Sequence, residues 1–133
     1  MASATFLLLL SALMPTPASD EGRRAPEGRW GGTGISIQVD SAGAKIELDC
    51  ASGAVSGSLL LDADGRFDVA GTYERGSMGP VREGAAPKVE PARYRGRLEG
   101  ESLTLEILLG RGGKAIGPFT ARRGAPARIR SCL

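Results

Sequence analysis

In Ala44-Lys45-Ile46-Glu47-Leu48-Asp49-Cys50, apolar and charged side chains alternate without a break. A period of two places successive side chains on opposite faces of the chain, and therefore predicts a β-strand with one buried face. The same alternation is clear at 66–73, 93–99 and 103–109, and weaker at 33–39, 55–61, 115–121 and 127–132. No segment has the 3.6-residue period of a helix. The sequence therefore predicts an all-β protein of eight strands.

The connections between these segments are short and rich in Gly and Asp, as β-hairpins require. Examples are Asp40 to Gly43, Asp62 to Gly65, Glu99 to Glu101 and Gly110 to Gly113. Consecutive strands should then be antiparallel neighbours. A meander with one apolar face removes its free edges by closing, which predicts an eight-stranded antiparallel up-and-down barrel. The alternative is a two-sheet β-sandwich.

One connection is different, because residues 75–91 form a long segment that is rich in Gly and Pro and has no periodicity. Long irregular loops in small domains are usually either functional or disordered. Two interpretations stay open, a binding or lid loop and a mobile insertion without a specific role.

The first 18 residues have the anatomy of a signal peptide. An apolar run from Ala4 to Met14 is followed by Pro15 to Ala18, and the chain turns polar at Ser19. The run is too short to span a bilayer, which takes about 20 residues. We expect cleavage after Ala18, no membrane anchor afterwards, and a periplasmic or secreted protein. Residues 19–27 then form a flexible N-terminal arm, and residues 28–133 a single barrel domain with the long loop at 75–91.

The chain has two cysteines, Cys50 and Cys132. An even number in an exported protein predicts one disulfide bond. Closing a loop of about 80 residues would stabilise the fold by roughly 4 to 5 kcal/mol in the chain-entropy model. The alternative is two free thiols or a redox pair, although the cysteines are not in a Cys-x-x-Cys arrangement.

Charge and composition disfavour several function classes. The 17 basic and 15 acidic residues are interspersed and leave a net charge of +2, too little for nucleic-acid binding. The chain has no His, so the commonest general base and zinc ligand are missing. The carboxylates of the predicted strands fall on their solvent faces, namely Glu47, Asp49, Asp68, Glu99 and Glu106. We therefore expect no catalytic residues, metal or cofactor, and rank an enzyme last.

Gly28-Arg29-Trp30 stands where the polar arm ends. A Gly-x-Trp at the start of strand one, followed by an antiparallel barrel with a basic residue on its last strand, resembles the calycin superfamily of lipocalins, fatty-acid-binding proteins and avidins. The resemblance implies that Trp30 closes one end of the barrel and that Arg128 or Arg130 packs across its indole, a cation–π contact.

The calycin resemblance also implies a ligand inside the barrel, which should be largely apolar. The aromatic and apolar side chains expected on the inner face would line it, or would simply fill a barrel of this size. These tentative lining residues are Trp30, Phe67, Tyr73, Tyr94, Leu105 and Phe119.

A second resemblance is to bacterial periplasmic inhibitors of secreted metalloproteases, which are eight-stranded barrels of similar size that act through an N-terminal segment. The arm at 19–27 would play that part. The inhibitors pair cysteines close in sequence, however, whereas Cys50 and Cys132 are far apart. The leading hypothesis is a non-enzymatic binding or scaffold domain of the bacterial envelope that takes a small apolar ligand or a protein partner, and the inhibitor is the alternative.

Overall fold

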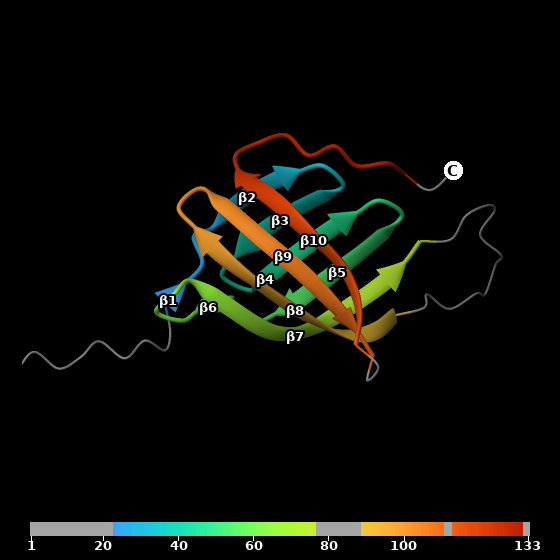
Figure 1. Cartoon of the computed structure of the whole chain (residues 1–133), viewed down its shortest axis with the longest axis horizontal. Coiled ribbons are helices and arrows are strands. Elements are labelled where there is room, and N and C mark those ends of the chain that lie inside the picture. The colour runs from blue at the N-terminus through green and yellow to red at the C-terminus, as the bar shows by residue number, and fades with distance from the viewer. Residues whose placement is uncertain (1–22, 77–88, 111–112, 132–133) are drawn as a thin grey trace, which may run out of the picture.

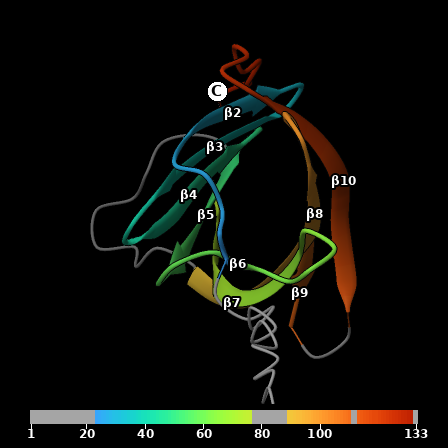
Figure 2. The same cartoon turned by 90° about the vertical axis from the view of Figure 1, so that its left-hand side faces the viewer.

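The computed structural model describes residues 23–76, 89–110 and 113–131. Every regular element in these ranges is a strand, and eight strands form a closed antiparallel barrel (Figure 1, Figure 2). The barrel strands are β2 (Gly28–Gly32), β3 (Ile35–Asp40), β4 (Gly43–Leu48), β5 (Ala51–Ser56), β7 (Arg66–Arg75), β8 (Val89–Glu99), β9 (Ser102–Leu109) and β10 (Lys114–Arg123). Each pairs with the next, and β10 returns to β2. The predicted up-and-down barrel is confirmed, and the sandwich alternative is wrong.

The eight strands are not quite the eight that the alternation indicates. The alternation missed the first barrel strand, β2, although the Gly-x-Trp motif places the start of a strand there. The strand expected at 55–61 is wrong, because β5 ends at Ser56 and β6 lies outside the barrel. The segment expected as the last strand, at 127–132, has among its described residues only an isolated bridge from Arg128 to Thr33. Consecutive glycines at 31 and 32 conceal the period of β2. Both are needed, because a Cβ on Gly31 would overlap the backbone of Ala125 and one on Gly32 would overlap the carbonyl of Thr120.

An irregularity in β10 explains why its alternation is weak in the sequence. The pairing of β10 with β9 shifts between Ile116 and Phe119, and Gly117 and Pro118 lie in the shift. Ile116 pairs with Ile107 and Phe119 with Leu105, both of which are buried. The extra residue of a bulge thus keeps both side chains on the inner face although they are three positions apart.

A second, two-stranded sheet lies at one end of the barrel. It pairs β1 (Arg23–Arg24) with β6 (Leu60–Leu61), and Figure 2 shows the segments that carry these strands crossing the barrel end. The Ala25 amide donates to the Leu59 carbonyl at 2.9 Å, and the side chains of both residues are buried. In the arm that was expected to be flexible, residues 23–25 are thus hydrogen-bonded to the segment 59–61, and Ala25 adds an apolar side chain to the core.

Several expectations fall outside the described residues, or at their borders. The signal peptide at 1–18, the start of the arm at 19–22 and Cys132 all lie outside. Of the loop expected at 75–91, Arg75 belongs to β7 and Val89 to Pro91 belong to β8, while 77–88 lies outside the described residues. Among the described residues, no helix is long and apolar enough to cross a membrane.

Candidate functional site

The residues expected to line a ligand pocket come together inside the barrel. Five of the six are buried in one apolar cluster, and Phe119 is half-buried and packs against it. Trp30 and Tyr94 are each only 1% exposed. No polar or charged residue is buried among the described ones. The interior is therefore a hydrophobic core to which residues from all eight barrel strands contribute.

Almost no free volume remains in this core. A cavity of about 10 Å³ lies among nine apolar residues, including Ile37, Tyr94 and Leu105. That is about the room that one water molecule needs, whereas sites for small organic ligands usually measure roughly 300 to 1,000 Å³. In this conformation the predicted lining residues fill the barrel, which is the second of the two interpretations left open for them.

Glycines on neighbouring strands make room for the largest rings. Gly53 of β5 and Gly71 of β7 both face Tyr94, and a Cβ on either would overlap that side chain. Gly96 faces Phe67 in the same way. Because protein interiors are densely packed, a side chain at these positions would need the ring to move. The glycines at these positions thus leave the space that the aromatic rings of the core occupy.

Among the described residues, only Tyr94 has a pKa that is clearly shifted from its ordinary value. Its hydroxyl donates to the carbonyl of Thr72 at 2.5 Å. Burial raises the pKa of Tyr94 to about 12, and the neighbouring Tyr73 adds to the effect. Desolvation disfavours the phenolate, so this hydroxyl stays protonated. It serves as a fixed hydrogen-bond donor inside the wall of the barrel.

Trp30 lies on the inner face of β2, as the Gly-x-Trp motif implies, but its neighbour is not the one expected. The register places Arg123 of β10 opposite Trp30, and the Arg123 guanidinium donates to the Glu27 carbonyl at 3.2 Å. Arg128 and Arg130 lie beyond β10 and are exposed. The Trp30 Nε1 atom is buried without a hydrogen-bond partner.

Arg128 and Arg130 instead belong to a tail, residues 124–131, that runs along β2 (Figure 1). Arg128 exchanges backbone hydrogen bonds with the β2–β3 turn, since its amide donates to Gly32 at 3.0 Å and its carbonyl accepts from Gly34 at 2.7 Å. The Arg130 amide donates to the Asp49 carboxylate at 2.6 Å, and the Arg130 carbonyl accepts from the Cys50 amide at 3.3 Å. The tail thus leads to Cys50, although the bond to Cys132 itself stays a prediction.

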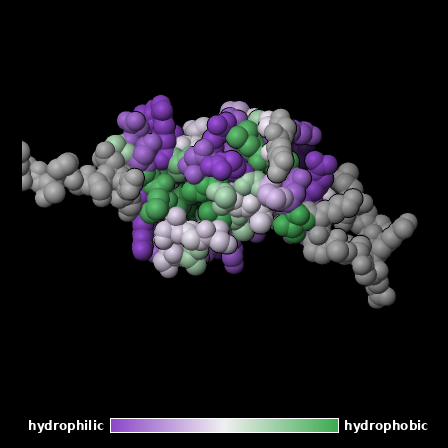
Figure 3. Space-filling view, turned by 90° about the horizontal axis from the view of Figure 1, so that it is seen from below, coloured by the Kyte–Doolittle hydropathy of each residue, from purple (hydrophilic) through white to green (hydrophobic). Residues whose placement is uncertain are grey.

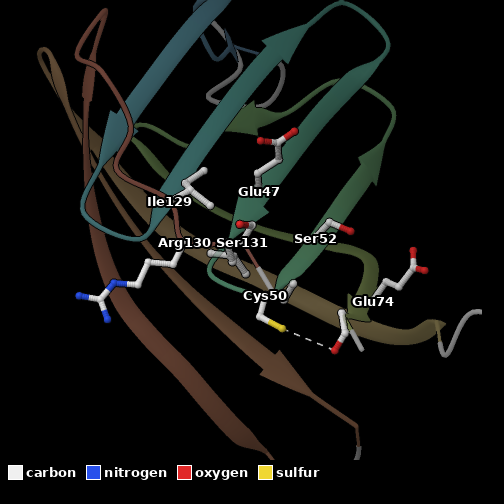
Figure 4. Close-up of a pocket in the computed structure, with 10 residues that line it drawn as sticks. Glu47, Cys50, Ser52, Glu74, Ile129, Arg130 and Ser131 are labelled. Atoms are coloured by element: carbon white, nitrogen blue, oxygen red, sulfur yellow. Dashed lines mark hydrogen bonds between the residues drawn. The ribbon is translucent and has the colours of Figure 1, made fainter. Parts of the chain in front are cut away.

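A groove of about 360 Å³ separates this tail from β4, β5 and the end of β7 (Figure 4). The register places Ser52 directly between Glu47 and Glu74 on the outer face. The Cα atoms of the two glutamates are then about 10 Å apart, which is two strand spacings. The Arg130 side chain points away from them in Figure 4, and the Cys50 sulfur faces the Gly76 carbonyl at 3.6 Å. The strand side of the groove therefore presents negative charge to solvent.

The outer face of β7, β8 and β9 carries a row of arginines, each beside a carboxylate. Arg93, Arg95 and Arg97 project at alternate positions of β8 and are exposed. Their ion pairs are Arg93 with Asp68 at 2.9 Å, Arg95 with Glu106 at 3.9 Å and Arg97 with Glu99 at 2.9 Å. Exposed pairs of this kind contribute about 0 to 1 kcal/mol each. The arginines therefore remain available to a ligand at little cost.

Comparison with known proteins adds no relative to this description. No protein-family model matches the chain, and neither the curated proteins nor the solved structures include a match. The barrel is compatible with a calycin-like fold.

Proposed function

We propose that this chain is an exported, non-enzymatic binding domain that recognises a protein of the bacterial envelope through the outer face of its barrel. The observation that carries the proposal is the filled interior, in which the cavity beside Tyr94 and Leu105 measures about 10 Å³. A ligand of ordinary size finds no room there. The apolar run from Ala4 to Met14, followed by Ala18, supports export.

The outer face offers what a protein partner needs. It carries charged side chains of both signs, with Arg93, Arg95 and Arg97 along β8, each beside a carboxylate, and Glu47 and Glu74 across the β4–β5–β7 face. Surfaces of opposite sign steer association and fix orientation more than they add affinity. We also propose a remote calycin relationship, supported by Gly28 and Trp30 at the start of the barrel and by Arg123 in place of the arginines first expected.

Site-specific photo-crosslinking in the bacterial envelope tests this function. A photoreactive residue replaces Arg95 on β8 or Gln38 on β3, both exposed, and Ile107 serves as the buried control. We expect one outer position to capture a defined protein and the control to capture none. Capture from no outer position, together with an apolar adduct retained by the purified protein in native mass spectrometry, would refute the proposal. The intact mass also reports cleavage after Ala18.

The inhibitor hypothesis remains the second candidate, and one observation favours it. Arg23 and Arg24 pair with Leu61 and Leu60, so any segment before them leaves the barrel from a fixed point. A fixed base lowers the entropy cost of inserting a segment into a partner. Deleting residues 19–22 discriminates, because inhibition of a secreted protease would be lost whereas binding through the outer face would persist.

A further inference from the structure

A hollow of about 310 Å³ opens on the outer face of β7, β8 and β9. Three arginines line it, Arg66 from β7 with Arg95 and Arg97 from β8, and β9 contributes Thr104 and Glu106. Figure 3 views the molecule from below, the side on which β7 and β8 lie in Figure 1, and shows strongly hydrophilic residues gathered beside apolar ones. The lining thus carries three positive charges and one negative charge.

Two of these three arginines are cross-strand neighbours of like charge, whereas Arg95 lies between Asp68 and Glu106. Arg66 and Arg97 are directly opposite each other in the β7–β8 ladder, and Thr104 follows opposite Arg97 on β9. Like charges in such a cross-strand pair destabilise a sheet. Arg66 forms no ion pair with any carboxylate of the described residues. The Arg97 Nε donates to the Asp64 carbonyl at 3.3 Å and its Nη1 pairs with Glu99 at 2.9 Å, and neither of these residues lines the hollow, so a phosphate would compete with both contacts.

We propose that this hollow binds a phosphate group, held between the guanidiniums of Arg66 and Arg97. The planar fork of arginine matches the oxygens of a phosphate in a bidentate way, and two such forks balance its two negative charges. The Thr104 hydroxyl is a further donor in the same row, and Arg95 is held only loosely by Glu106, at 3.9 Å. The phosphate is either free or the headgroup of a lipid, since the recognising chemistry is the same.

This inference does not depend on the proposed protein partner, and purified protein suffices to test it. Inorganic phosphate is titrated at constant ionic strength against ¹⁵N-labelled protein, and the amide and arginine Nε signals are followed. We expect saturable shifts at Arg66, Arg97 and Thr104. The variant Arg66→Gln with Arg97→Gln should bind at least tenfold more weakly, whereas Arg29→Gln with Arg75→Gln, which removes the same charge from exposed positions of β2 and β7, should change affinity less than twofold.

A charge-conserving variant separates the bidentate geometry from net charge. Arg66→Lys with Arg97→Lys retains both positive charges but lacks the forks, so its affinity should fall between those of the wild type and the Gln variant. If the Gln variant and the control pair lose the same affinity for phosphate, binding depends on net charge alone and the inference is overturned. So would shifts that do not saturate.

Vesicle flotation distinguishes the two sources of phosphate. Vesicles of phosphatidylcholine with phosphatidic acid are compared with phosphatidylcholine alone. Flotation with phosphatidic acid that is lost in the Arg66→Gln, Arg97→Gln variant indicates a lipid headgroup. Binding of inorganic phosphate without flotation indicates a free ligand, and failure of both probes refutes the site.

Discussion

Tyr94 and Gly53 show how tightly single residues are matched inside the barrel. A Cβ at position 53 would overlap the Tyr94 hydroxyl. Gly53→Ala should therefore lower the free energy of unfolding by about 1 to 3 kcal/mol, the usual cost of overpacking. Chemical denaturation measures it, with Ser52→Ala as the control because Ser52 is the exposed neighbour.

A second variant identifies the cause of this loss. Combining Gly53→Ala with Tyr94→Phe removes the oxygen that the new methyl group meets, so the two costs should be less than additive. Full additivity would contradict the packing argument.

The acidity of Tyr94 predicts how stability depends on pH. An unperturbed tyrosine ionises near pH 10, whereas burial raises the pKa of Tyr94 to about 12 in the folded protein. The unfolded chain therefore releases this proton first. The resulting stabilisation is complete below pH 10 and is lost between about pH 10 and 12, an effect on the order of 2 kcal/mol.

Denaturation curves of wild type and Tyr94→Phe between pH 8 and 12 check this expectation. The difference in stability between the two proteins should shrink as the pH rises, because only the wild type has a phenol at this position to ionise. Curves that stay parallel up to pH 12 would show that position 94 does not contribute to alkaline unfolding.

At the scale of elements, the tail at 124–131 is attached by backbone hydrogen bonds and one carboxylate. Asp49 accepts from the Arg130 amide at 2.6 Å, and hydrogen bonds to charged groups contribute roughly 1.5 to 3 kcal/mol. Asp49→Ala should speed hydrogen exchange of the Arg130 amide at least tenfold. Glu47→Ala is the matched control on the same hairpin, and equal exchange in both variants would contradict this anchoring.

The elements also show where sequence reasoning works. Strands β4, β7, β8 and β9 could be predicted because each alternates without interruption. Strand β2 could not be predicted, because Gly31 and Gly32 have no side chains to alternate. Glycine is needed at these two positions because the tail and β10 pack against them. The pairing of Arg23 and Arg24 with β6 was equally hidden, because a two-residue strand has no period.

For the molecule as a whole, the closed barrel was predictable and the state of its interior was not. Alternation places Tyr94 and Leu105 inside, but whether facing rings meet depends on register and barrel size. The arginine hollow was missed for a related reason. Arg66 and Arg97 are far apart in sequence, and only the β7–β8 register makes them neighbours.

The filled interior predicts how ligand binding changes when space is created. Wild-type protein should retain no benzene in native mass spectrometry or by NMR titration, whereas Leu105→Ala, beside the existing cavity, should take it up. The substitution should cost about 2 to 5 kcal/mol of stability. Saturable binding of benzene to the wild type would mean that the barrel opens more readily than its packing suggests.

The barrel closes between its first and last strands, where Arg122 pairs with Gly31 and Arg123 with Trp30. A gene could therefore be rearranged so that translation starts at Gly43, passes from Arg123 through a linker to Gly28, and stops at Asp40. Such a circular permutant would keep every ladder of the barrel, though it would omit the tail and β1. The closed ring of strands would therefore tolerate another starting point.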